Sequence, residues 1–279
     1  MRKKIAFALT ACILLSGCIM NTDTQNDHDG FFGETLNIRE QVWTRHQSSR
    51  DSSTFSSIWF ERFRGDRNVS NGFLHGTTHV DNGGSGAVAN GLLDFSIGTP
   101  NQLELSLERT LALPFVGLLS SRYYDFKISD PEARGTRLFL NTWPWPGGGW
   151  MNRYFRDTSV VVQGTETKET DLIEQVMFIY VDRDVTVTGS GRVDDRRFTC
   201  PCRDLCVCEG SSYLCRCNGA SILTLGELDL ALRAGWNAVH LRFEMGVVTS
   251  ESRLLRTFQS IAITLGDPSH LRWTLFGSY

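Results

Sequence analysis

Long apolar segments are scarce in this sequence of 279 residues. After the first 20 residues, the longest candidate is Leu111 to Leu119, which has nine residues and contains Pro114. A helix that crosses a bilayer needs about 20 mostly apolar residues. Beyond the N-terminal region we therefore expect a water-soluble body without a membrane-spanning helix.

Several catalytic motifs are also missing. The sequence has no Gly-x-Ser-x-Gly turn, no glycine-rich phosphate loop ahead of a helix, and no His-Glu-x-x-His pair. A glycoside hydrolase stays open as an alternative, because its two acidic groups need no local motif. The missing motifs favour a non-enzymatic role, and the sequence assigns no catalytic or cofactor-binding residue.

Positive charge is in short supply, and arginine far outnumbers lysine. The first 17 residues hold three of the 28 Lys and Arg residues and none of the 31 Asp and Glu residues. The rest of the chain therefore has 25 basic and 31 acidic residues, a formal net charge of about −6. The basic residues are scattered along the chain, whereas a nucleic-acid binder needs a clustered positive face. We therefore expect no nucleic-acid partner.

The chain begins with an export signal. Three basic residues at positions 2–4 precede a mostly apolar stretch at 5–15, which is too short to span a bilayer. The stretch ends in Leu15-Ser16-Gly17-Cys18. This motif resembles the lipobox of bacterial lipoproteins. The resemblance implies that residues 1–17 are removed and that Cys18 becomes a lipidated N-terminus carrying fatty acyl chains such as palmitate.

The implied anchor predicts where the protein works. Each buried methylene contributes about 0.8 kcal/mol, so the three chains expected on Cys18 would hold the protein firmly on a membrane. Residues 19–22 lack the aspartate that retains many lipoproteins at the inner membrane. We expect a cell-envelope location, at the outer membrane where the host has two. Residues 18–33 are expected to form the lipidated N-terminus and a flexible tether, and 34–279 a β-rich extracytoplasmic domain.

A repeat of two residues dominates from residue 35 onward. In the expected strands at 35–43 and 91–98, alternate apolar residues share one side. The segment 103–119 stays undecided between strand and helix, because its leucines fit both spacings. Further strands are expected at 58–63, 137–143, 174–181, 184–189, 222–232, 238–244, 260–265 and 271–276.

The segments between the strands carry turn residues. We expect Asp182-Arg183, residues 233–237 and residues 266–268 to reverse the chain between neighbouring strands. Many short strands and little helix predict an all-β fold, either an antiparallel β-sandwich or a calycin-like barrel. If there are two subdomains, the break is expected near 144–170. The Leu-Arg-Ala-Gly-Trp-Asn turn at 232–237 is similar to a feature of uncharacterised bacterial lipoproteins, which implies an extracytoplasmic β domain and no particular activity.

Six cysteines form three Cys-x-Cys pairs within one short window. Residues two apart on a strand share a face, so each pair presents two thiols to one side. Hairpins closed at 203–205 and 209–214 would bring the thiols to the Cα separation of about 4.4–6.8 Å that a disulfide needs. The cysteines are Cys200, Cys202, Cys206, Cys208, Cys215 and Cys217.

Disulfides are the favoured state of these cysteines, because thiols oxidise outside the cytoplasm. The cluster would then staple a long hairpin. Six cysteines allow 15 connectivities, and a nested pairing of Cys202 with Cys206 and Cys200 with Cys208 is one of them. Zinc held by four thiolates is the alternative.

Two further groups are candidate binding residues. Trp143, Trp145 and Trp150 flank a Pro/Gly loop, where exposed indoles would contact sugar rings or a partner protein. The alternative places them over the core. His75, His79 and Asp81 are candidate metal ligands, although histidines in such a Gly/Thr-rich segment are usually just solvated.

These observations together predict a membrane-anchored cell-envelope lipoprotein. Its expected role is non-enzymatic, either structural or the binding of a protein, glycan or lipid. The alternative is a secreted-side hydrolase that acts on polysaccharide.

Overall fold

The computed structural model of the chain describes residues 30–47, 58–75, 78–101, 103, 105–112, 124–143, 149–191, 206–208, 215–217, 220–251 and 253–276. The predicted signal, Cys18 and most of the predicted tether lie outside these residues. Within the described part, strands make up nearly all regular structure, and the short α1 (Leu107–Ala112) is its one helix.

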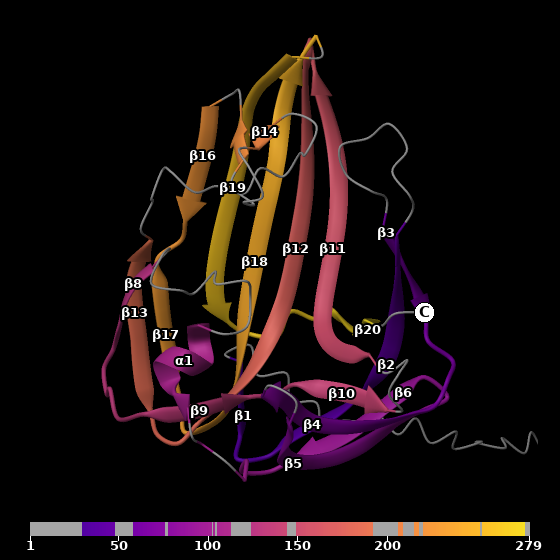
Figure 1. Cartoon of the computed structure of the whole chain (residues 1–279), viewed down its shortest axis with the longest axis vertical. Helices are drawn as coiled ribbons and strands as arrows, with labels where there is room; N and C mark the ends of the chain where they lie inside the picture. The colour runs from indigo at the N-terminus through magenta and orange to yellow at the C-terminus, as the bar shows by residue number, and fades with distance from the viewer. Residues whose placement is uncertain are drawn as a thin grey trace, which may run out of the picture.

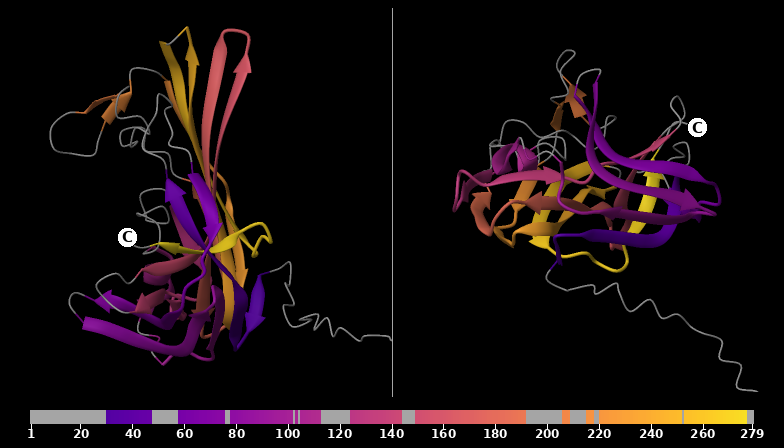
Figure 2. Two further views of the ribbon diagram at one scale, coloured as in Figure 1. Left: turned by 90° about the vertical axis from the view of Figure 1, so that its right-hand side faces the viewer. Right: turned by 90° about the horizontal axis from the view of Figure 1, so that it is seen from below.

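Four long antiparallel strands form the centre of the fold (Figure 1). β12 and β18 are paired over their whole length, from Glu166 opposite Ser250 to Val181 opposite Gly235. β11 and β12 form one hairpin, and β18 and β19 form the other. The turns of these two hairpins therefore lie at the same end, above the rest of the molecule (Figure 2). There, Val160–Val162 are exposed. The order is β11 (Trp150–Gln163), β12 (Glu166–Val181), β18 (Gly235–Ser250) and β19 (Arg253–Leu265).

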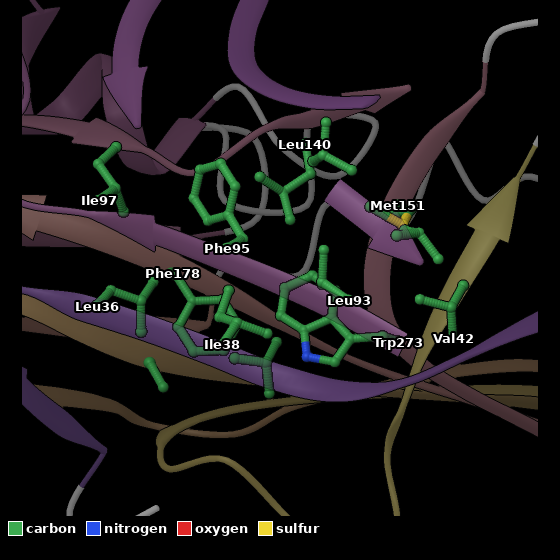
Figure 3. Packing of buried hydrophobic residues seen from close by; sticks show 14 of the residues in the cluster. Leu36, Ile38, Val42, Leu93, Phe95, Ile97, Leu140, Met151, Phe178 and Trp273 are labelled. Carbon is green, nitrogen blue, oxygen red and sulfur yellow. The ribbon is translucent and has the colours of Figure 1, made fainter. Parts of the chain in front are cut away.

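At its other end, β11 closes a ring of seven strands, since β10 pairs with both β11 and β4. The ring order is β10 (Leu140–Trp143), β4 (Arg67–His75), β5 (Thr78–Ala89), β6 (Leu92–Ile97), β2 (Leu36–Gln47), β20 (Arg272–Phe276) and β11. Apolar side chains from the ring, with others from β12 and β18, form the first core (Figure 3). The ring is thus a packed barrel. Its core includes Leu36, Ile38, Val42, Leu93, Phe95, Ile97, Leu140, Met151, Phe178 and Trp273.

The opposite face of β12 and β18 covers a second core. From residue 176 to residue 181, the side chains of β12 enter the two cores alternately. A three-stranded sheet and α1 pack on this second face. The strands of that sheet, in order, are β17 (Leu228–Leu232), β13 (Val185–Gly191) and β8 (Tyr124–Ile128).

The remaining strands attach to this frame. β1 pairs with β18, β3 with β2, β7 with β9, β9 with β12 and β16 with β19, while β14 and β15 form a separate pair. Two described pairs are parallel, β2–β20 and β16–β19, and the others are antiparallel. These strands are β1 (Phe31–Gly33), β3 (Ile58–Arg62), β7 (Leu105–Ser106), β9 (Arg134–Arg137), β14 (Cys206–Cys208), β15 (Cys215–Cys217) and β16 (Ala220–Leu225).

The prediction of an all-β fold is confirmed, and the fold combines a barrel-like ring with packed sheets. β6 buries the side predicted for it, and so does β2 at its apolar positions. The undecided segment 103–119 contains β7 and α1 in its described part. The suggested break near 144–170 coincides with β11 and the start of β12, in the middle of the largest sheet.

The three predicted chain reversals connect strands that are not neighbours. Asp182-Arg183 leads from β12 to β13, residues 233–234 lead from β17 to β18, and 266–271 lead from β19 to β20. The expected strand at 222–232 is two strands, β16 and β17, which belong to different sheets. These predictions were wrong because β12 and β18 bury both faces, so the chain crosses between layers to cover each face.

A tight turn at Asn90-Gly91 joins β5 to β6. Both residues have positive φ, 50° and 80°, as a type I′ turn requires. The side chain of Gln41 on β2 donates from Nε2 to the carbonyl oxygens of Gly91 at 2.8 Å and of Phe63 at 3.2 Å. The turn is therefore held against β2 by a partly buried amide.

We expect Gly91→Ala to destabilise the protein by at least about 2 kcal/mol, because a non-glycine residue in the left-handed region costs about 1–3 kcal/mol before any clash. The added Cβ would also lie 1.8 Å from the carbonyl oxygen of Phe63. Gly164→Ala is the matched control, since Gly164 has φ +61° but nothing within 4 Å of the new Cβ. Urea denaturation measures both variants, and equal losses would contradict the role of crowding.

Candidate functional site

Aromatic and arginine side chains form a series over β3, β2, β20, β11, the segment before β10 and the end of β9, strands that are labelled in Figure 1. We call this set the aromatic surface. Its rings are Trp43, Phe60, Phe139, Trp150, Tyr154 and Phe276, and its cations are Arg62, Arg137 and Arg272.

Strand alternation explains why these residues share a face. Met151 and Leu275 are cross-strand partners buried in the first core. Their neighbours Trp150 and Phe276 are also cross-strand partners, so they project from the opposite side of β11 and β20. The same alternation on β2 places Trp43 on this outer side. β2, β20 and β11 thus have one face in the first core, and their opposite face carries members of the aromatic surface, of which Trp150 is exposed and Tyr154 is buried.

The rings form a continuous series. Trp150 stacks on Phe276 with 4.2 Å between ring centroids and 11° between planes. Phe139 stacks on Trp150 at 6.4 Å, and Tyr154 meets Phe276 edge-on at 5.1 Å. Phe60 of β3 lies 6.3 Å from Tyr154. These separations lie near the range of about 4.5–7 Å in which aromatic pairs attract one another.

Arginines continue the series beyond the rings. The guanidinium carbon of Arg272 lies 4.2 Å from the ring centroid of Trp43 and 5.9 Å from that of Phe60. Arg62 lies 5.6 Å from Trp43. Both arginines are exposed, so these cation–π contacts hold the guanidinium groups at the surface.

Arg137 lies at the other end of the series, 5.9 Å from the Phe139 ring centroid. It is partly buried, and burial lowers the pKa of its guanidinium below the usual value. Among the described residues, no carboxylate lies within 4.0 Å of Arg62, Arg137 or Arg272. Basic residues that are scattered along the sequence are therefore placed along one series of rings in space.

The predicted tryptophan cluster is only partly described. Trp150 is 40% exposed and belongs to the aromatic surface. Trp143 ends β10, but its side chain and the whole of Trp145 lie outside the described residues. Sequence reasoning missed Trp43 and Arg272. The available signal was their position on the outward side of strands whose inward side is apolar.

A second cluster joins Glu174 of β12 to His240 of β18 and His270 of the β19–β20 loop. The buried carboxylate lies 3.3 Å from Nε2 of His240 and 2.8 Å from Nε2 of His270. Nε2 of His240 is within ion-pair distance of the Glu174 carboxylate, but the two groups are not aligned for a hydrogen bond. Burial lowers the pKa of His240, and the nearby carboxylate opposes this effect only in part.

Arg153 binds the same β19–β20 loop through Asp267. Its buried guanidinium binds the carboxylates of Asp267 and Glu40, and so joins β11, β2 and the β19–β20 loop. Burial alone would lower the pKa of Arg153, but the two carboxylates raise it; burial raises the pKa of Asp267, which the cation partly opposes. Because the cation engages both acids, the arrangement fixes a loop and offers no free acid–base pair.

The other predicted ligands remain predictions. His75 and His79 lie on β4 and β5, where their side chains are outside the described part, as is that of Asp81. In the part of the chain that the structure describes, no three His, Cys, Asp or Glu residues are grouped to hold a metal ion. The described residues also include no helix long and apolar enough to cross a membrane.

Comparisons with protein families, curated proteins and solved structures found no match.

The cysteine hairpin is described only in its two short strands. β14 and β15 pair with Cys206 opposite Cys217 and Cys208 opposite Cys215, which agrees with a hairpin closed by residues 209–214. Directly opposite Cα atoms in an antiparallel pair lie about 4.5–5.5 Å apart. This lies inside the range of about 4.4–6.8 Å for a disulfide. Cys200 and Cys202 lie outside the described residues.

We expect disulfides between Cys206 and Cys217 and between Cys208 and Cys215, because the register brings these pairs together. Trypsin cleavage after Arg203 and Arg216 separates the alternatives. The expected pairing links the tryptic peptide 204–216 to the peptide that begins at Cys217, whereas the nested pairing links it to the peptide that ends at Arg203. Non-reducing peptide mapping of the protein, expressed in a bacterium with its predicted signal, makes the measurement, and bound zinc with free thiols would contradict both pairings.

Proposed function

We propose that the protein is a lipid-anchored lipoprotein of the cell envelope that binds a polysaccharide through the aromatic surface without altering it. The observation that carries this proposal is the continuous series of rings around the exposed Trp150. Aromatic side chains supply large apolar faces with little conformational freedom to lose, which suits stacking on the apolar faces of sugar rings.

The extent of the series favours a polymer over a single sugar. Its contacts run from Phe139, just before β10, through β11 and β20 to Phe60 on β3. A ligand that lies along them would cross several strands. An extended chain of sugar units meets this condition better than a compact molecule enclosed in a pocket.

The location proposed for the protein rests on the lipobox-like motif before Cys18. The first described strand, β1, starts at Phe31 and pairs with β18 near Trp236. Residues 18–29 would then tether this end of the domain to the membrane, at the outer membrane in a host with two.

We expect Trp150→Ala to weaken polysaccharide binding at least tenfold, which corresponds to about 1.4 kcal/mol. The physical reason is the loss of the exposed ring and of its 4.2 Å stack on Phe276. Affinity electrophoresis of the soluble domain in gels that contain purified neutral or acidic polysaccharides measures the retardation.

Trp59→Ala is the matched control. Trp59 is 50% exposed on β3, but it alternates with Phe60 and stacks on His46, on the other face. This variant should bind as the wild type does. Failure of every polysaccharide to retard the wild type, or unchanged binding by Trp150→Ala, would contradict the proposal. Release of new reducing ends during incubation would instead favour the hydrolase.

We also expect the full chain, expressed in a bacterium, to fractionate with membranes and to carry acyl chains on residue 18. Cys18→Ala should leave an unlipidated product that does not anchor, because the acylated thiol is gone. Mass spectrometry of the N-terminal peptide measures the modification, with Cys12→Ala as the control for loss of a thiol within the signal. A mature wild type with an unmodified thiol at Cys18 would contradict the anchor.

A further inference from the structure

The three arginines of the aromatic surface differ from the other arginines that the structure places beside acids. Arg153 binds two carboxylates, Arg156 binds Asp171 at 2.7 and 2.5 Å, and Arg183 binds acids at 3.0 and 3.1 Å. In the described part of the chain, Arg62, Arg137 and Arg272 have aromatic partners and no ion pair. Within the described residues, their charges are thus not neutralised by a carboxylate.

These arginines also lie along the ring series. Arg137 extends it beyond Phe139, and Arg62 extends it beyond Trp43, at the opposite end. Arg272 lies within the series, between Trp43 and Phe60. A linear ligand that follows the rings would therefore meet a cation near each end and another on the way.

The chemistry of arginine indicates which charged groups the ligand would carry. A guanidinium group stacked on a ring keeps its N–H edge free, and that edge matches the two oxygens of a carboxylate or phosphate. Arg137 is already partly desolvated, so an anion beside it would offset the cost of burying the charge. The mature chain has a formal net charge of about −6, which on average repels a polyanion, so attraction would depend on these arginines.

Building on the proposed polysaccharide binding, we propose that the ligand is an anionic polysaccharide whose carboxylate or phosphate groups bind Arg62, Arg137 and Arg272 while its sugar rings stack along the aromatic surface.

The test compares polygalacturonate, a carboxylated polysaccharide, with dextran, a neutral one, by affinity electrophoresis and titration calorimetry of the soluble domain. We expect polygalacturonate to bind and dextran to bind at least tenfold more weakly. Raising the salt from about 0.1 M to about 1 M shortens the Debye length from about 10 Å to about 3 Å, so binding should weaken at least tenfold.

Two double variants locate the charge effect. Arg62→Gln/Arg272→Gln should lose at least tenfold in affinity for polygalacturonate. Arg183→Gln/Arg242→Gln removes two exposed arginines that face carboxylates away from the aromatic surface, and should bind as the wild type does. Arg272→Lys keeps the charge and should retain salt-sensitive binding, which guards against a fold defect in the glutamine variant; circular dichroism checks each fold.

The outcomes separate this inference from the function on which it rests. Equal binding of dextran and polygalacturonate would overturn the anionic ligand and leave polysaccharide binding in place. Equal losses in both double variants would show general charge attraction and overturn the inference. Binding only to vesicles of anionic lipid, with no polysaccharide bound, would overturn both proposals.

Discussion

Two adjacent strands, β12 and β18, bury both of their faces where residues 176–181 pair with residues 235–240. Most of the architecture follows from this constraint. Their apolar runs, such as Val176–Val181, leave no side that can face water. Strands buried on both faces need a layer on each side. The seven-stranded ring supplies one layer, and the sheet of β8, β13 and β17 with α1 supplies the other.

The aromatic surface arises because the ring strands bury only one of their two faces in a core. Their inner sides complete the first core, while their outer sides lie beyond the cover that β13, β17 and α1 provide. Large rings on such a side are partly protected by one another, as the stack of Trp150 on Phe276 shows. The buried Arg153, with its two carboxylates, ties the β19–β20 loop to this region, and so positions the start of β20 and with it Arg272.

Much of the local structure could be predicted from the sequence. The apolar alternation that buries Leu36 and Ile38 on β2, or Phe95 on β6, depends only on residues within one strand. Strand pairing was harder, because a turn residue indicates that the chain changes direction and does not say which strand it reaches. Asp182-Arg183 has the composition of a hairpin turn, yet it carries the chain into another layer. The Asn90-Gly91 turn shows that a hairpin signal was available and was overlooked.

The candidate site was less predictable. The contact between Phe60 on β3 and Tyr154 on β11 depends on the path of two intervening strands, which no local pattern encodes. In the same way, Arg62, Arg137 and Arg272 are far apart in sequence, so no local pattern predicts that they lie along one series of rings. Trp150 was identified because it stands beside a Pro/Gly loop, where exposure is common.

The long central hairpins also make the domain elongated. A strand of 16 residues such as β12 extends about 50 Å at about 3.3 Å per residue. Its end at Val181 pairs with Gly235 of β18, close to where β1 pairs with the same strand, whereas its beginning at Glu166 lies near the exposed valines at the end of β11. The long strands would therefore keep a ligand bound at the ring apart from any molecule that contacts the turns of the hairpins.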